Sequence, residues 1–166
     1  MRALIGYELL CALVQPDISP ENRAVADWFA QQQRAPQPLR FFAASTTFAV
    51  VEADALSAPG GAPNTRGTLM RFRATMFRAR RVYEIDERVT SVLGRLLAWW
   101  DAREPQIDAD AFELVECAVA LEHGRCLIAP ASPLITELQI THQLRWFDPW
   151  QQLGVQAPAK PKATRR

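Results

Sequence analysis

Short apolar segments that read as strands alternate with helix-like segments along this 166-residue chain, and that alternation limits the fold more than any other feature. The expected strands are residues 2–5, 39–44, 82–85 and 126–129. Between them, apolar residues recur at helical spacing behind capping residues such as Asp86, or Ser19 followed by Pro20. Short strands separated by helices predict parallel βαβ units with helices on both faces of the sheet. We therefore expect an α/β fold with a single domain over residues 1–153.

Local signals set further boundaries in the first half of the chain. Thr46 or Thr47 is expected to cap a helix that runs through Leu56. Residues 57–64 are rich in proline and glycine and therefore read as a loop. Apolar residues at helical spacing over residues 69–77 predict the next helix.

The last third of the chain is less regular. A helix is expected from about Asp110 to His123, because Gly124 stands where a helix commonly ends. Residues 134–147 show partial alternation, which predicts one or two final strands. Residues 154–166 are rich in proline, lysine and arginine, and we expect a basic, disordered tail.

Composition excludes several classes of protein. A net charge of +1 gives no bulk attraction for polyanions, and 49% hydrophobic against 22% charged residues is typical of globular proteins. Cys11, Cys117 and Cys126 are far apart, which predicts buried thiols in a reducing cytoplasm and no zinc site or disulfide. Glu8 interrupts the first apolar segment, and no apolar run reaches the ~18 residues of a membrane span. We expect a soluble, cytoplasmic protein.

Acidic residues fall near one predicted edge of the sheet. Glu8 follows the first strand, Glu52 lies in the helix after the second, and Asp108, Asp110 and Glu113 begin a later helix. In an open parallel sheet, the functional crevice lies beyond the carboxyl ends of the strands. Carboxylates from three segments at this edge would suit Mg²⁺ or Mn²⁺, which prefer oxygen ligands.

Each of these acids also has a purely structural interpretation. Asp108, Asp110 and Glu113 would be favourable at a helix N-terminus whether or not they bind anything. Glu8 would be an ordinary solvated residue in a first helical turn. Glu52 is the least expected, because its neighbours on both sides are apolar.

Several stretches of the chain follow one another in the order of a known family. They are "ALIGYELLCAL" at 3–13, "PENRAVADWFAQQ" at 20–32, "FFAASTTFAVVEADAL" at 41–56, "VYEIDERVTSVLGRLLA" at 82–98, "DADAFELVECAVALEHGRCLIA" at 108–129 and "FDPW" at 147–150. In this order they resemble the PIN-domain family, and within it the VapC-like toxins of bacterial type II toxin–antitoxin modules. The resemblance implies a three-layer α/β/α sandwich around a short parallel sheet. It also implies about four clustered acids that hold Mg²⁺ or Mn²⁺ and activate water against RNA.

The acids of the family match this chain only in part. The family's aspartate at the tip of the first strand falls on Gly6, and its nearby asparagine falls on Glu8. Glu52 matches the helix glutamate, and Glu113 stands where the family has aspartate. The fourth acid falls in residues 129–132, where this chain has none. The resemblance thus implies a degenerate site with two acids absent and one altered.

Two hypotheses of function remain open at this stage. The first is a PIN-like protein that is weakly active or non-catalytic and acts by binding a partner or a nucleic acid. The alternative is an active Mg²⁺- or Mn²⁺-dependent endoribonuclease with a rearranged site, in which Glu8 replaces the strand-tip acid and Asp110 supplements Glu113. Under either hypothesis, the resemblance implies a homodimer, an antitoxin-like protein partner and RNA as possible partners.

Arginines are concentrated between Asp54 and Glu84, a segment without any acid. The arginines are Arg66, Arg71, Arg73, Arg78, Arg80 and Arg81. Arg71, Arg73 and Arg78 are candidates for contacts with nucleic-acid phosphates, which the guanidinium fork can bind in a bidentate manner. The alternative is a solvated helix face, or ion pairs with the acid-rich residues 104–122.

Overall fold

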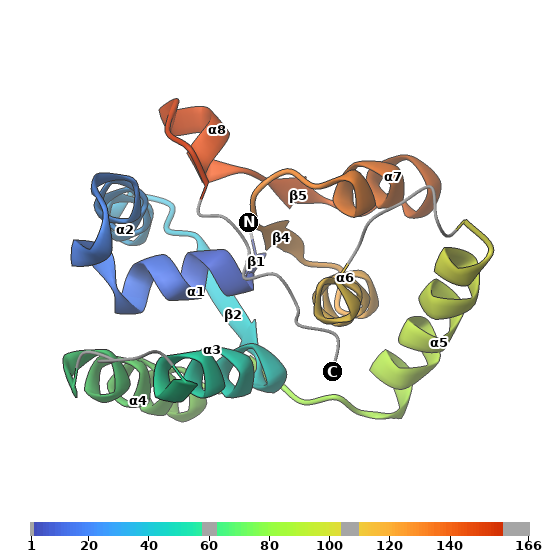
Figure 1. Ribbon diagram of the computed structural model, residues 1–166, viewed down its shortest axis with the longest axis horizontal. Coiled ribbons are helices and arrows are strands. Elements are labelled where there is room, and N and C mark those ends of the chain that lie inside the picture. Colours follow the sequence, from blue (N-terminus) through green and yellow to red (C-terminus); the bar gives the residue numbers. More distant parts are fainter. Residues whose placement is uncertain (1, 58–62, 104–109, 158–166) are drawn as a thin grey trace.

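The computed structural model describes residues 2–57, 63–103 and 110–157, and its elements are labelled in Figure 1. In chain order they are β1 (Arg2–Ile5), α1 (Tyr7–Val14), the short 3₁₀ helix η1 (Pro16–Ile18), α2 (Pro20–Arg34), β2 (Arg40–Ala44), α3 (Ser45–Ser57), α4 (Pro63–Arg78), β3 (Val82–Tyr83), α5 (Glu87–Asp101), α6 (Ala111–Glu122), β4 (Cys126–Ile128), α7 (Pro133–His142), β5 (Trp146–Phe147) and α8 (Pro149–Leu153). Most of the predicted loop at 57–64, Asp108 and residues 158–166 of the predicted tail lie outside the described residues.

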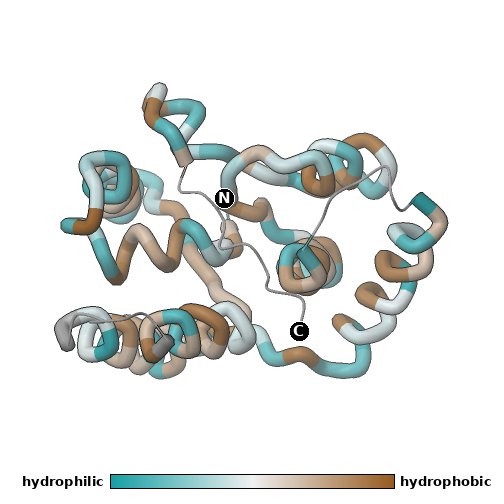
Figure 2. The backbone as a smooth tube through the Cα atoms, viewed as in Figure 1, coloured by the Kyte–Doolittle hydropathy of each residue, from teal (hydrophilic) through white to brown (hydrophobic). Residues whose placement is uncertain are grey.

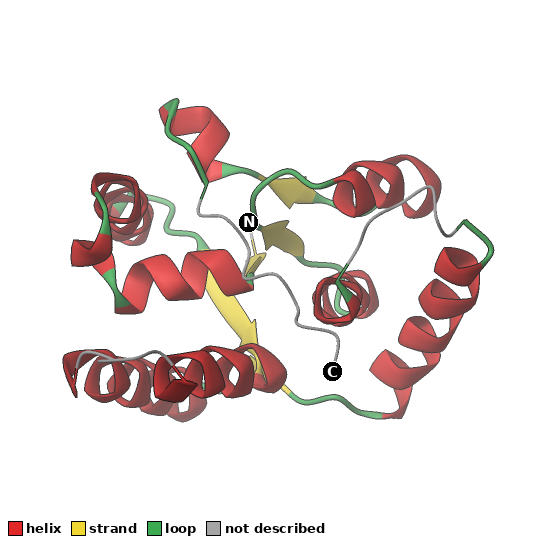
Figure 3. Ribbon diagram, in the orientation of Figure 1, coloured by secondary structure: helices red, strands yellow, loops and turns green. Residues whose placement is uncertain are grey.

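The five strands form one parallel sheet in the order β3-β2-β1-β4-β5 (Figure 3). β1 is the central strand, and its Ile5 pairs with Ala43 of β2 on one side and with Ile128 of β4 on the other. The chain first builds outward from β1 to β3 and then returns to build β4 and β5 on the other side. This change of direction places a topological switch point between β1 and β4, beyond whose carboxyl ends ligands commonly bind.

Helices cover both faces of the sheet, and α1 to α4 lie on one side and α5 to α7 on the other (Figure 1). Alternate residues of β1 enter the two cores: Ala3 and Ile5 pack with α1 to α4, and Leu4 packs with α5 to α7. α1, the helix that follows β1, is mostly hydrophobic along its length (Figure 2). The predicted three-layer α/β/α sandwich is therefore confirmed.

Three predicted helix ends are confirmed by their capping geometry. The Ser19 hydroxyl accepts a hydrogen bond from the Asn22 amide at 3.1 Å, and Pro20 occupies the first helical position of α2. The Asp86 carboxylate accepts one from the Val89 amide at 2.9 Å. Gly124 follows α6 with a φ of 57°, the left-handed conformation that favours glycine at this position.

Two predictions of secondary structure were wrong. Neither Thr46 nor Thr47 caps α3, because the helix begins at Ser45, directly after β2. Residues 133–142 form the helix α7 where the alternation predicted a strand, and β5 is confined to Trp146–Phe147. Among the residues described, the model contains no helix that is both long enough and apolar enough to span a membrane.

Candidate functional site

The candidate site lies at the carboxyl edge of the sheet, where β1, β2 and β4 end side by side. Gly6 follows β1, Ser45 opens α3 directly after β2, and Ala129 follows β4. The N-terminal half of α6 also reaches this edge, because Glu116 lies next to Gly6.

Gly6 is in close backbone contact with β4. Its amide donates a hydrogen bond to the carbonyl oxygen of Ile128 at 3.0 Å. A Cβ atom at this position would lie 2.8 Å from that oxygen and 3.3 Å from the Cβ of Ala129. Its φ of −79° is an ordinary value, so glycine is required here by the lack of space and not by the backbone conformation. The place where the family carries its strand-tip aspartate is therefore closed by packing.

Glu116 is a buried acid that was missed in the sequence. Its carboxylate comes within 3.6 Å of the position that a Gly6 Cβ would occupy, and only 3% of the residue is exposed. The Thr47 hydroxyl donates a hydrogen bond to Glu116 Oε1 at 3.1 Å, so Thr47 links α3 to α6. The available signal was a second acid, one turn after Glu113 on the same helix face, in a segment whose other residues are mostly apolar.

Glu113, a predicted site residue, is also buried, with 5% of its surface exposed. The Ser132 hydroxyl donates a hydrogen bond to Glu113 Oε1 and at the same time caps α7 by accepting from the Ile135 amide at 3.1 Å. Ser132 belongs to the stretch in which the family carries its fourth acid. In this chain, Ser132 donates its hydroxyl hydrogen to the carboxylate of Glu113, the residue that the resemblance matches to the family's third acid.

Glu8 is buried in the first turn of α1, and its negative charge contributes to the raised pKa of Cys11, one turn later. Burial raises the pKa of the Cys11 thiol to about 12, and the hydrogen bond with Tyr7 opposes this shift. This value includes smaller upward contributions from the negative charges of Glu8, Asp54 and Glu116. Glu8 and Glu116 therefore lie close enough to one thiol to act on the same ionisation.

Tyr7 connects the same helices from the start of α1. Its hydroxyl donates a hydrogen bond to Asp54 of α3, and its ring meets the edge of Phe112 on α6 with 6.2 Å between centroids. Burial and the hydrogen bond to Asp54 raise the pKa of Tyr7, so the phenol stays protonated. Tyr7 thus fixes the entrance to α1 between two neighbouring helices.

The other two predicted acids have different surroundings. Glu52 is partly exposed on α3 and forms ion pairs with Arg66 at 3.8 Å and with Arg73 at 3.5 Å, both on α4. Asp110 is exposed and caps α6, where its carboxylate accepts a hydrogen bond from the Phe112 amide at 3.0 Å. The structure therefore directs Glu52 towards α4 and gives Asp110 a capping role.

No metal-binding group emerges from this arrangement. In residues 2–57, 63–103 and 110–157, no set of three or more His, Cys, Asp or Glu side chains is arranged to hold a metal ion. The two buried glutamates of α6 accept hydrogen bonds from protein hydroxyls, and no side chain extends from the tip of β1. The donor set of the described residues does not fit the divalent ion that the resemblance implies.

The three arginines predicted to contact nucleic acid do not share one surface. Arg71 and Arg78 lie seven residues apart on one side of α4, because a heptad spans almost two helical turns. Arg73 lies on the other side and pairs with Glu52. The alternative pairing with the acid-rich residues 104–122 is not the one seen for Arg66 and Arg73.

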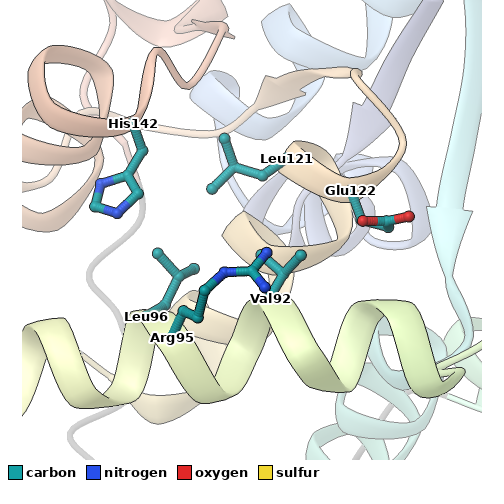
Figure 4. Close-up of a pocket in the computed structure, with 6 residues that line it drawn as sticks. All are labelled: Val92, Arg95, Leu96, Leu121, Glu122 and His142. Carbon is teal, nitrogen blue, oxygen red and sulfur yellow. The ribbon is translucent and has the colours of Figure 1, made fainter.

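A separate cavity of about 270 Å³ lies between α5, α6 and the end of α7 (Figure 4). Val92 and Leu96 point from α5 towards Leu121 of α6, and these three side chains form its apolar part. The polar lining residues are Arg95, Glu122 and His142. Among the described residues that line it, Glu122 is the only acid, so these residues offer no paired carboxylates for acid–base or metal chemistry.

Comparison with known proteins shows similarity in structure but not in sequence. No family model matches the chain, and no curated protein matches it. The structure of VapBC2 from Rickettsia felis bound to a promoter DNA fragment is similar with a TM-score of 0.63 and 11% identity, covering 89% of this chain and 98% of that chain. FitAcB from Neisseria gonorrhoeae gives a TM-score of 0.62 with 14% identity, covering 90% and 99%.

A third similar structure is VapBC-1 from nontypeable Haemophilus influenzae, with a TM-score of 0.53 and 18% identity, covering 89% of this chain and 98% of that chain. At such low identity, the similarity shows the fold and leaves the chemistry to be argued from the site. The chain has the PIN-like α/β/α fold, and it shares this fold with the VapBC2, FitAcB and VapBC-1 structures.

Proposed function

We propose that this protein is a PIN-like member of the toxin–antitoxin group that acts by binding a partner and has little or no metal-dependent ribonuclease activity. The observation that carries the proposal is the packing of Gly6. A Cβ atom on this residue would lie only 2.8 Å from the carbonyl oxygen of Ile128. A carboxylate cannot stand at this strand tip unless the backbone of β4 moves.

The surroundings of the remaining acids support the same conclusion. A Mg²⁺ or Mn²⁺ site needs several carboxylate oxygens that converge on one point. Here the Glu116 and Glu113 carboxylates are hydrogen-bonded to Thr47 and Ser132, and Glu52 is paired with arginines of α4. These contacts hold the acids as parts of the packed structure.

The proposed partner is an antitoxin-like protein in the bacterial cytoplasm. The similar structures from Rickettsia felis and Neisseria gonorrhoeae are named as VapBC2 and FitAcB, and a further one is FitAB bound to a DNA fragment. The chain covers 96% or more of each of these matched chains, so the whole fold is available for a comparable assembly.

The alternative function is an active endoribonuclease that uses a rearranged set of carboxylates. It is favoured by one observation: the Glu116 carboxylate lies beside Gly6, and Glu8, also buried, follows Gly6 by two residues, so two buried acids lie near the carboxyl end of β1. Glu113 or Asp110 would have to complete such a set.

Incubation of the purified protein with structured RNAs and Mn²⁺ or Mg²⁺ separates the two functions. We expect no cleavage beyond that of the Glu116→Gln and Glu52→Gln variants. Metal-dependent cleavage that either substitution abolishes would establish the alternative. The variants replace a carboxylate with an amide of the same shape, so a loss of cleavage would report on the carboxylate itself.

A further inference from the structure

The outward face of α4 carries apolar and small residues at heptad spacing. Gly67, Met70, Ala74 and Phe77 follow one another at intervals of three, four and three residues, the spacing of the a and d positions of a coiled coil. All four are exposed, Met70 at 46% and Phe77 at 42%. We call these four residues the α4 stripe.

The stripe is not needed to hold α4 on the protein. The opposite side of the helix carries Thr65, Leu69 and Met76, which are at most 5% exposed, and Phe72, which packs against the same core. The helix therefore buries one apolar face in the fold and leaves a second one in solvent. A soluble helix normally has a polar outer face, so a second apolar stripe marks an interaction surface.

The positions that flank the stripe on both sides are arginines. Arg66 and Arg73 occupy the g positions, and Arg71 and Arg78 occupy the e positions of the same heptads. The Arg73 guanidinium lies over the Phe77 ring at 5.5 Å from its centroid, so this cation covers part of the apolar surface. In helix pairs, e and g residues select the partner by charge.

Gly67 gives the stripe an open place for close approach. A Cβ atom added there would meet nothing within 4 Å. Glycine inside a helix costs about 0.5–1 kcal/mol relative to alanine, and nothing in the fold requires it at this position. Gly67 and Ala74 carry no side chain beyond Cβ, so a second helix can come close to the α4 backbone between Met70 and Phe77.

We propose that the α4 stripe docks an amphipathic helix of a partner protein, one with apolar residues at its a and d positions and glutamate or aspartate at its e and g positions. This inference rests on the proposed function, because it identifies the surface through which the partner binds. A second copy of this chain does not fit. Parallel pairing would set Arg66 against Arg71, and antiparallel pairing would set like positions together, so arginines would meet arginines in both orientations.

Nucleic acid fits this face less well than an acidic helix does. The exposed Met70 and Phe77 separate the two rows of arginines, so a phosphate chain that used both rows would have to cross an apolar ridge.

The test uses the full-length protein and two synthetic helical peptides with leucine at every a and d position. One peptide has glutamate at every e and g position, and the control peptide has lysine there. In fluorescence anisotropy, we expect the glutamate peptide to bind saturably and at least tenfold more tightly than the lysine peptide. We also expect the difference to shrink as salt is added, because exposed charges are screened.

Charge reversal makes the test independent of folding defects. The double variant Arg71→Glu, Arg78→Glu should lose its preference for the glutamate peptide and gain affinity for the lysine peptide. The pair Arg88→Glu, Arg95→Glu on α5 has the same seven-residue spacing and the same change of charge, and it should behave like the unmodified protein. Both double variants change exposed residues.

Equal affinity for the two peptides, or an unchanged preference after Arg71→Glu, Arg78→Glu, would overturn the inference. Preferential binding of a single-stranded RNA oligonucleotide by these two arginines, or self-association that the double variant abolishes, would also overturn it. None of these outcomes is evidence for or against the proposed lack of ribonuclease activity, because none of them measures RNA cleavage. An antitoxin-like partner whose binding the double variant leaves intact would leave the proposed function standing and remove only this surface.

Discussion

The hydroxyl of Thr47 donates a hydrogen bond to the carboxylate of Glu116 across 3.1 Å, although the two residues are 69 positions apart in the chain. Both are buried, Thr47 completely and Glu116 to 97%. The contact joins the first turn of α3 to the middle of α6 directly beside Gly6. A hydrogen bond within the protein thus ties the Glu116 carboxylate to α3 at the carboxyl edge of the sheet.

Replacing Thr47 by valine should therefore destabilise the fold. The variant keeps the shape of the side chain and removes the donor, which leaves a buried carboxylate with one partner fewer. We expect a loss of about 1–3 kcal/mol in the free energy of unfolding, measured by urea denaturation. Thr90→Val is a matched control, because Thr90 is an exposed threonine that bonds only the carbonyl of Asp86 in its own helix. Equal losses in the two variants would contradict a special role for the Thr47 contact.

Gly6 should not accept any side chain. Gly6→Ala places a Cβ 2.8 Å from a backbone oxygen, and we expect a destabilisation of about 1–3 kcal/mol from overpacking. Gly94→Ala is the control, since Gly94 is exposed in α5 and an added Cβ would meet nothing within 4 Å. That substitution should stabilise the protein by about 0.5–1 kcal/mol. Thermal denaturation checks both variants: the melting temperature should fall for Gly6→Ala and rise for Gly94→Ala. A stabilised Gly6→Ala variant would show that the strand tip has room for a side chain.

Stability should fall at alkaline pH because of Cys11. Its thiol has an ordinary pKa near 9 in the unfolded chain, and burial raises the pKa to about 12 in the folded protein. Below pH 9 both states keep the proton, so the stability is fully present. Between pH 9 and 12 the unfolded chain releases the proton first, and the equilibrium shifts towards unfolding.

The measurement is the urea midpoint as a function of pH for the wild type and for Cys11→Ala. The variant should lose less stability above pH 9 than the wild type does. Burial, and to a smaller extent the hydrogen bond to Asp54 and the contact with Cys11, also raise the pKa of Tyr7, which contributes a fall in the same direction. The difference between the curves therefore reports on Cys11 together with its effect on Tyr7. Parallel curves would show that the thiol is not held protonated by the fold.

Glu52→Gln should have a small effect on stability. Glu52 pairs with Arg66 and Arg73 at 3.8 and 3.5 Å, but the arginine side chains are 62% and 39% exposed. Solvent and salt screen such pairs, so we expect a change below about 1 kcal/mol. Chemical denaturation at low and high salt checks this estimate. A much larger loss that persists in high salt would mean that Glu52 makes a stronger contact than its ion pairs with α4.

Much of the fold was predictable because its signals are local. The caps at Ser19 and Asp86 and the end of α6 at Gly124 depend on residues within one turn of the cap, and all three were confirmed. α7 was missed because its buried residues Leu134, Ile135 and Leu138 lie in a short apolar segment. Over so few residues, helical spacing and strand alternation are difficult to separate.

The candidate site was less predictable because its contacts are not local. The absence of an acid at Gly6 was visible in the sequence, but the atoms that take up the space there belong to Ile128 and Ala129, at the far end of β4 and more than a hundred positions away in the chain. Whether Glu52 faces the sheet edge or the neighbouring helix depends on the packing of α3 against α4, and local spacing does not determine that packing. Asp110 shows the same limit, since a helix-capping acid and a ligand have the same local sequence.

The central claim is that the carboxylates near Gly6 serve packing and do not bind a divalent ion. The most direct test is a Mn²⁺ titration of the full-length protein followed by electron paramagnetic resonance. The signal of free Mn²⁺ decreases as the ion binds, so its intensity measures binding. We predict that the wild type binds no more Mn²⁺ than the Glu116→Gln, Glu113→Gln double variant does. Stoichiometric binding by the wild type that the double variant loses would contradict this account.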